Sequence, residues 1–184
     1  ADNAPAPTCL QVNTLLSNPS EVERELTEQE ISFRKHPWLP GCYLVKGTGN
    51  LAKLDLFSSG RVYVQDPSAK LAAMAAGVKP GMQVLDTCAA PGGKSFALAM
   101  EMKNEGSVTS CDIHAHKISL IEKGAERLGI SIITAREADA SKFQEAFKDG
   151  FDVVVADVPC SGLGVIRKKP DIRYKDLAPM QKLP

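Results

Sequence analysis

The sequence has no long hydrophobic run. No apolar stretch in its 184 residues approaches the roughly 20 residues of a transmembrane helix, and no charged-then-apolar signal peptide opens the chain. We therefore expect no membrane contact and a cytoplasmic location. The chain also lacks an excess of either charge, because 22 basic and 22 acidic residues give a formal net charge of zero. A nucleic-acid partner would have to be bound by a local basic patch.

Paired cysteines are missing as well. The five cysteines are odd in number and none forms a C-x-x-C pair: Cys9, Cys42, Cys88, Cys111 and Cys160. This pattern argues against a zinc site or a disulfide framework and fits a reducing compartment. We expect no metal site.

The chain divides into three segments by composition. Residues 1–8 are polar and proline-rich, which predicts a flexible arm. Residues 9–60 predict a small β-α-β-α piece, about half of an appended module, with a helix capped by Ser17 or Asn18. Residues 61–184 form the larger segment. The length suits one α/β domain with a smaller appendage.

The larger segment alternates strand-like and helical patterns. Strand-like runs at 82–86, 107–112, 131–137 and 151–157 are separated by helical segments, the last a short one at 142–148. Such alternation predicts β-α-β units and a parallel sheet. In sheets of this kind, ligands bind beyond the carboxyl ends of the strands.

Acidic residues mark those carboxyl ends. The four runs end in, or are soon followed by, Asp86, Asp112, Asp139 and Asp157. Asp112 lies twenty residues after Gly92, where an acid can accept hydrogen bonds from both ribose hydroxyls, and Asp139 can reach an adenine amino group. The pattern favours an adenosine-containing cofactor. The alternative is that these acids only cap helices, as Asp139 and Ser141 could do for 142–148.

The loop "DTCAAPGGKS" at 86–95 narrows the choice of cofactor. It lacks the G-x-G-x-x-G of dinucleotide sites, and it matches a phosphate-binding P-loop except that Cys88 replaces the first glycine. Pro91 also removes an N–H group from a loop that would have to donate such groups to phosphates. S-Adenosylmethionine has no phosphate and tolerates both features. A P-loop nucleotidase remains the rival interpretation.

A second cluster follows the last strand. Cys160 comes three residues after Asp157, in a loop where a thiolate could act as a nucleophile or merely fill space. A local basic cluster comes next: Arg167, Lys168, Lys169, Arg173 and Lys175. Beside a catalytic rim this cluster predicts contacts with an RNA phosphate backbone.

Together these motifs carry a family resemblance. "VQDPSAKLAA", "DTCAAPGGKS" and "DVPCSGLGVIRKKPDIRYK", with the spacing between them, resemble the RNA cytosine-5 methyltransferases of the Sun/NOL1/NOP2 family over about residues 9–178. The resemblance implies a Rossmann-like methyltransferase sheet, incomplete at the C-terminus, S-adenosylmethionine as cofactor, and a partial, RNA-binding, ferredoxin-like N-terminal subdomain. It also implies that the partner is RNA, specifically small-subunit ribosomal RNA because the nearest branch of the family acts on it, and that the protein is a monomer.

The resemblance also implies roles for individual residues. Asp112 would hold the ribose, Asp139 the adenine, and Asp157 the floor near the transferred methyl group. The loop that wraps the methionine end of the cofactor would consist of Cys88, Ala89, Ala90, Pro91, Gly92, Gly93 and Lys94. Cys160, Asp157 and Lys94 form the implied catalytic set.

The chain departs from the family in one respect. Family members carry the P-C cysteine, matched by Cys160, and a later T-C cysteine that is the nucleophile, whereas no cysteine follows Cys160 here. We therefore expect a fragment that binds cofactor, with Cys160 as the residue that releases the product. A non-catalytic cofactor- or RNA-binding module is the further alternative.

Overall fold

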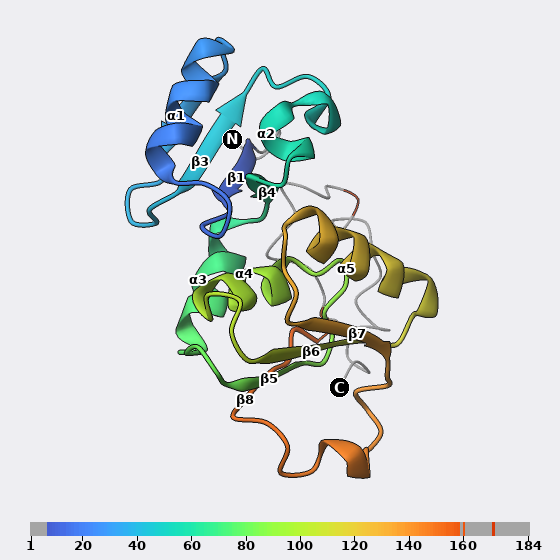
Figure 1. Cartoon of the computed structure of the whole chain (residues 1–184). Coiled ribbons are helices and arrows are strands. Elements are labelled where there is room, and N and C mark those ends of the chain that lie inside the picture. The colour runs from blue at the N-terminus through green and yellow to red at the C-terminus, as the bar shows by residue number, and fades with distance from the viewer. Residues whose placement is uncertain (1–6, 159, 161–170, 172–184) are drawn as a thin grey trace. The chain divides into compact units, whose positions relative to one another are not determined.

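The structure of the chain is a computed structural model that describes residues 7–158, 160 and 171. The chain divides into two units, Thr8–Asp157 and a second unit of Ala1–Pro7 with Val158–Pro184. All the helices and strands named below belong to Thr8–Asp157 (Figure 1). Within the described part of the chain, no helix is long and apolar enough to cross a membrane.

The N-terminal part contains an antiparallel sheet with strand order β2-β3-β1-β4. Its elements are β1 (Thr8–Val12), α1 (Pro19–Glu28), β2 (Ser32–Lys35), β3 (Cys42–Lys46), the 3₁₀ turn Leu51–Lys53, α2 (Asp55–Ser58) and β4 (Val62–Val64). This β-α-β-β-α-β order is the complete ferredoxin-like arrangement.

The sequence predicted only part of this subdomain. It missed β2, because "SFRK" has a single apolar residue and no clear alternation. The sheet also extends beyond the predicted limits, since β1 begins at Thr8 and β4 lies past residue 60 and pairs with β1. The last helix of the predicted β-α-β-α piece is divided into the 3₁₀ turn and α2.

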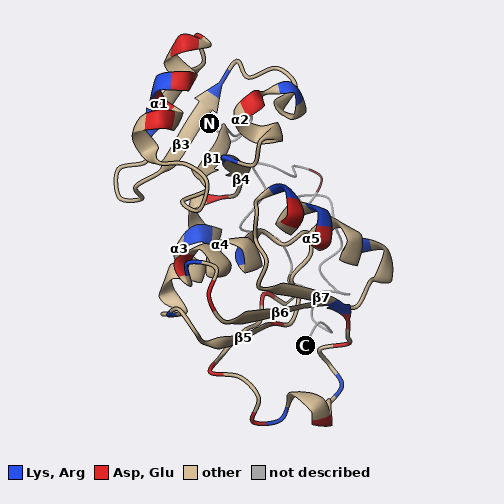
Figure 2. Ribbon diagram, viewed as in Figure 1, with Lys and Arg blue, Asp and Glu red and all other residues tan. Residues whose placement is uncertain are grey.

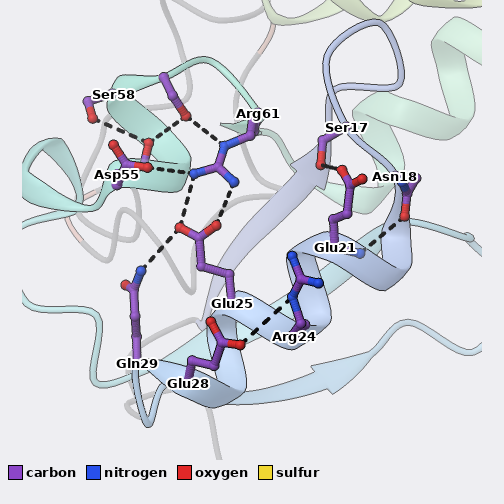
Figure 3. Close-up of polar contacts among 11 residues, drawn as sticks. Ser17, Asn18, Glu21, Arg24, Glu25, Glu28, Gln29, Asp55, Ser58 and Arg61 are labelled. Carbon is purple, nitrogen blue, oxygen red and sulfur yellow. Dashed lines mark hydrogen bonds and ion pairs between the residues drawn. The ribbon is translucent and has the colours of Figure 1, made fainter.

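Polar contacts fix the helices of this part (Figure 3). The side chain of Asn18 accepts a hydrogen bond from the Glu21 backbone N–H at 3.1 Å, which confirms a predicted cap of α1. The guanidinium of Arg61, just before β4, donates to both carboxylate oxygens of Glu25 on α1, at 2.5 and 3.1 Å, and to Asp55 on α2. One arginine therefore joins both helices to the start of β4, an edge strand of this sheet.

The larger part is the predicted parallel sheet, with strand order β7-β6-β5-β8. Its elements are α3 (Pro67–Ala75), β5 (Gln83–Asp86), α4 (Gly93–Glu101), β6 (Ser107–Asp112), α5 (Ala115–Arg127), β7 (Ile133–Glu137), the 3₁₀ turn Glu145–Phe147 and β8 (Val153–Val155). The predicted helix at 142–148 is only this 3₁₀ turn. From β5 the chain adds β6 and β7 on one side of β5 and then β8 on the other side, so a topological switch point lies between β5 and β8.

The two sheets meet at the C-terminal end of α5. The buried side chain of Asn13, after β1, donates to the carbonyls of Gly60 and Leu128, both at 2.8 Å. Arg127 donates to the carbonyls of Phe57 and Val62. Tyr63 of β4 packs in the same apolar cluster as Phe96 and Leu98 of α4. The antiparallel sheet is thus attached to the parallel one by buried polar and apolar contacts.

Candidate cofactor and active site

The switch-point strand β5 ends in a carboxylate that is fully buried. Oδ2 of Asp86 accepts a hydrogen bond from Ser95 on α4 at 2.7 Å, and Ser95 in turn accepts one from Ser110 on β6 at 2.8 Å. The other oxygen, Oδ1, is buried and has no hydrogen-bond partner among the described residues. Burial raises the pKa of Asp86, and the hydrogen bond from Ser95 opposes this shift. An acceptor of this kind suits a positively charged ligand group nearby.

Several backbone N–H groups of the loop after β5 are hydrogen-bonded to backbone carbonyls. Thr87 donates to the carbonyl of Val155 at 2.9 Å, Ala89 to that of Cys111 at 2.7 Å, and Gly92 to that of Ala89 at 2.7 Å. Pro91 has no N–H group to offer. A phosphate cradle needs such donors to point at the ligand. The backbone geometry therefore disfavours the P-loop interpretation.

Two glycines let this loop close tightly onto α4. Gly92 has φ +108°, and a Cβ atom there would lie 2.4 Å from Cζ of Phe96. At Gly93 a Cβ atom would lie 3.4 Å from the buried Nε2 of Gln65, an atom without a hydrogen-bond partner among the residues that the structure describes. The close approach of Gln65 places the end of the antiparallel sheet directly against the loop.

Asp112 ends β6, as the sequence predicted, and is largely buried. Its Oδ1 accepts a hydrogen bond from the backbone N–H of His114 at 3.0 Å and lies 3.8 Å from Nζ of Lys117. Its Oδ2 has no hydrogen bond with any described residue. The carboxylate is therefore held in place through one oxygen while the second remains available to hydroxyl donors.

Asp139 follows β7 and makes local contacts. Its Oδ1 accepts hydrogen bonds from the Ser141 N–H at 3.0 Å and from the Ser141 hydroxyl at 2.6 Å, and Oδ2 lies 3.3 Å from Nζ of Lys142. These contacts lower the pKa of Asp139, the hydroxyl of Ser141 most of all. The sequence left open the alternative that Asp139 and Ser141 cap a helix at 142–148; in the structure Asp139 instead accepts hydrogen bonds from Ser141 within a turn.

A pocket of about 260 Å³ lies at the carboxyl ends of the strands. Its walls are Leu85, Thr87, Cys111, Ala138, Asp139, Ala140, Lys142, Phe143, Gln144, Phe147 and Lys148. Asp139 is the one predicted site residue in this lining. Phe143 and Phe147 of this lining were not predicted. Their position shortly after Asp139, four residues apart, is the sequence signal that points to them.

Lys94 and Asp157 are brought together across the switch point. Nζ of Lys94, in the first turn of α4, donates to Oδ2 of Asp157, which follows β8. The side chain of Lys94 is about one-fifth exposed and that of Asp157 more than half exposed, so the pair lies at the rim. The two residues were predicted together as part of the catalytic set, and a cation–carboxylate pair at the rim can hold or relay a proton to a substrate.

Two further groups were predicted at this rim. Cys160 is exposed and belongs to the second unit, so its role stays a prediction. The basic cluster of Arg167, Lys168, Lys169, Arg173 and Lys175 lies outside the described residues.

Comparison with known proteins identifies the family. Residues 73–182 match the model of the family described as 16S rRNA methyltransferase RsmB/F. The chain is 44% identical over 172 residues to a probable ribosomal RNA small subunit methyltransferase B of Bacillus subtilis, covering 92% of this chain and 38% of that protein. It thus spans well under half the length of this relative.

Solved structures agree with the fold. The crystal structure of PH0851 is 30% identical, with a TM-score of 0.91 over 95% of this chain and 40% of that one. A methyltransferase homologue from Pyrococcus horikoshii is 26% identical, with a TM-score of 0.79 over 94% of this chain and 57% of that one. Both confirm the Rossmann-like methyltransferase sheet. Because the family match spans more than half of the sequence, the chain belongs to the 16S rRNA methyltransferase RsmB/F family.

Proposed function

We propose that this chain is the cofactor-binding core of an S-adenosylmethionine-dependent RNA methyltransferase that modifies carbon 5 of cytosine in small-subunit ribosomal RNA. The observation that carries the proposal is Asp112, whose carboxylate is anchored through Oδ1 and open at Oδ2. It ends the strand next to β5, and the pocket lined by Asp139 begins beside it. Ribose and adenine groups would occupy these two places.

The cofactor fits the chemistry of the residues present. In the loop from Cys88 to Lys94, the N–H groups of Ala89 and Gly92 are already bonded to backbone carbonyls, which suits a ligand end without phosphates. Asp86 supplies buried negative charge beneath this loop, where the amino-acid end of the cofactor would lie. When bound, S-adenosylmethionine supplies an electrophilic methyl group on a sulfonium centre.

Methyl transfer requires that the cytosine first be activated, because its carbon 5 is a poor nucleophile. A cysteine thiolate adds to carbon 6, and the electron pair displaced from the 5,6 double bond makes carbon 5 nucleophilic toward the methyl group. After transfer, a base removes the proton from carbon 5 and the thiolate leaves carbon 6. We assign Lys94 and Asp157 to hold the cytosine at the rim and Cys160 to the release step, with the nucleophile supplied by the family's T-C cysteine.

A binding titration tests the cofactor assignment. S-Adenosylhomocysteine should bind, whereas ATP with magnesium should not. Asp112→Asn keeps the acceptor for the His114 N–H but removes the charge that faces the ribose, and it should weaken S-adenosylhomocysteine binding by about one to two decades, the equivalent of a charge-assisted hydrogen bond of roughly 1.5–3 kcal/mol.

The matched control is Glu122→Gln, which removes an exposed carboxylate on the outer side of α5. It should leave the dissociation constant unchanged. Tight magnesium-dependent ATP binding without a response to S-adenosylhomocysteine would overturn the proposal, and an unchanged affinity in Asp112→Asn would remove Asp112 from the ribose role.

A further inference from the structure

The single tryptophan of the chain is held in solvent. Trp38 lies in the loop between β2 and β3 and is 75% exposed. Its ring lies against His36 in a T-shaped arrangement, with 5.5 Å between the two ring centroids. Exposing so large an apolar ring forgoes a substantial burial energy, which points to a partner that covers it.

Basic residues lie along the strand that leads to this loop. Arg34 on β2 and Lys46 on β3 are exposed, and neither forms an ion pair with any residue that the structure describes. Lys46 is opposite Ser32 in the register, and Arg34 is opposite Leu44. Residues paired in this way share a face of the sheet, so Arg34 and Lys46 are diagonal neighbours on one face.

The other side of β2 is held differently. Nζ of Lys35 lies 2.8 Å from Glu23 of α1, and Glu23 also accepts a hydrogen bond from the Tyr43 hydroxyl at 2.7 Å. Helix α1 is mainly acidic, with four glutamates and one arginine, as the red segments of Figure 2 show. The unpaired cations therefore face away from the acidic helix, and a polyanion would meet β2 from their side.

The surface is short and open at the sheet edge. β2 is the outer strand of its sheet, and from Ser32 to His36 it extends about 13 Å at roughly 3.3 Å per residue. The pocket of about 250 Å³ that is lined in part by Glu23, Lys35 and Tyr43 opens on the other side of β2, toward α1. The exposed cations thus precede an exposed aromatic ring along the chain, on the side of β2 away from that pocket.

We propose that this β2 edge, made of Arg34, Lys46 and Trp38, binds a single-stranded segment of RNA, with phosphates against the two cations and one base stacked on the indole. Interleaved cations and aromatic rings are the usual means of holding single strands without reading sequence. A protein partner would need a wider apolar area, whereas Trp38 is the only large apolar side chain so exposed between residues 17 and 63. The assignment rests on the proposed RNA substrate and adds a contact outside the methyltransferase sheet.

The single tryptophan makes the test direct. Titration of the chain with a single-stranded oligonucleotide should quench the fluorescence of Trp38, because a stacked base covers the indole. Binding of a labelled oligonucleotide, followed by anisotropy, should weaken about tenfold in Trp38→Ala and change little in Trp38→Phe, which retains a stacking ring. Arg34→Gln should reduce the slope of log affinity against log salt by about 0.7.

Matched variants separate this surface from the cofactor site. Arg24→Gln removes an equally exposed arginine from α1 and should leave the salt slope unchanged. All these variants should bind S-adenosylhomocysteine as the unaltered chain does. An unquenched tryptophan at saturating oligonucleotide, or equal affinities in Trp38→Ala and Trp38→Phe, would overturn the surface, whereas failure to bind S-adenosylhomocysteine with quenching intact would overturn the cofactor proposal alone.

Discussion

The two sheets of the unit Thr8–Asp157 differ in how they use their carboxylates. In the antiparallel sheet, carboxylates are paired with cations and stabilise the helices, as Glu25 and Asp55 do with Arg61 and Glu23 does with Lys35. In the parallel sheet, two buried carboxylates at strand ends each keep one oxygen without a hydrogen bond from any described residue, Oδ1 of Asp86 and Oδ2 of Asp112, whereas Asp157 at the rim is paired with Lys94. Buried carboxylates with an open oxygen at strand ends favour a ligand site.

The comparison also shows how one region supports the other. Gln65, at the end of the antiparallel sheet, lies against Gly93 of the cofactor loop, and Asn13 and Arg127 tie the sheets together. The end of the antiparallel sheet thus packs directly against the loop after β5. Breaking the junction should therefore affect both sheets.

The largest effect is expected at Gly60. Its φ is +76°, and a Cβ atom there would lie 1.9 Å from the carbonyl oxygen of Arg127, which is backbone and cannot move aside. Gly60→Ala should reduce the free energy of unfolding by about 3 kcal/mol or more, as the sum of a left-handed backbone and overpacking. Denaturant unfolding followed by circular dichroism measures it.

Gly77 offers a control with the same backbone cost. Its φ is +65°, and no atom lies within 4 Å of the position of an added Cβ. Gly77→Ala should lose only about 1–2 kcal/mol. Equal losses in the two variants would mean that the close contact between Gly60 and α5 contributes nothing.

An intermediate effect is expected from two carboxylates with opposite pKa shifts. Burial raises the pKa of Asp86 above its ordinary 3.8, so its ionisation disfavours the folded state, and this cost is relieved as the pH falls through the raised pKa. Hydrogen bonds from Lys35 and Tyr43 lower the pKa of Glu23 below 4.5, so its stabilising contribution is present above pH 4.5 and is lost as the pH falls through the lowered pKa.

Substitution of each acid should therefore change the pH profile in opposite directions. Asp86→Asn should stabilise the chain at pH 7, with a gain that shrinks toward low pH, while S-adenosylhomocysteine affinity falls. Glu23→Gln should destabilise it at pH 7, with a loss that shrinks on acidification. Urea unfolding between pH 3 and 7 measures both, and Glu28→Gln, an exposed acid on the same helix as Glu23, is the control. Parallel profiles for the two variants would contradict the contrast between the sheets.

Sequence patterns predicted the parallel sheet better than the antiparallel one. The strands β5, β6 and β7 read clearly because each ends in an acid and helices separate them, and β8 is a run of valines two residues before Asp157. β2 was not predicted, because it forms through pairing with β3, a tertiary contact for which "SFRK" carries no local pattern. The complete ferredoxin-like order therefore appears only in the structure.

The candidate site was predicted in its residues but not in its contacts. In the sequence, Cys88 and Pro91 disfavour a P-loop; in the structure, the N–H groups of Ala89 and Gly92 disfavour it as well, because they are already bonded to backbone carbonyls. Likewise, sequence placed Asp112 and Asp139 at strand ends but gave no means of knowing which oxygens remain open. Such facts depend on how the segment 138–148 folds back over the strand ends, which local pattern does not determine.

The smallest effect is expected at the cap of α1. Asn18 accepts the hydrogen bond of the Glu21 N–H, one of the unpaired donors at a helix start, with Pro19 in the first position. Asn18→Ala should lower the free energy of unfolding by about 1 kcal/mol, and Asn18→Gly by only a few tenths, because glycine leaves the helix end open to water. Both variants should leave S-adenosylhomocysteine affinity unchanged, since the cap stabilises the antiparallel subdomain and contacts no residue of the cofactor site. A loss of cofactor affinity in Asn18→Ala without a matching loss of stability would show that α1 affects the loop after β5. It would contradict the separation of a stabilising role in the antiparallel sheet from a binding role in the parallel one.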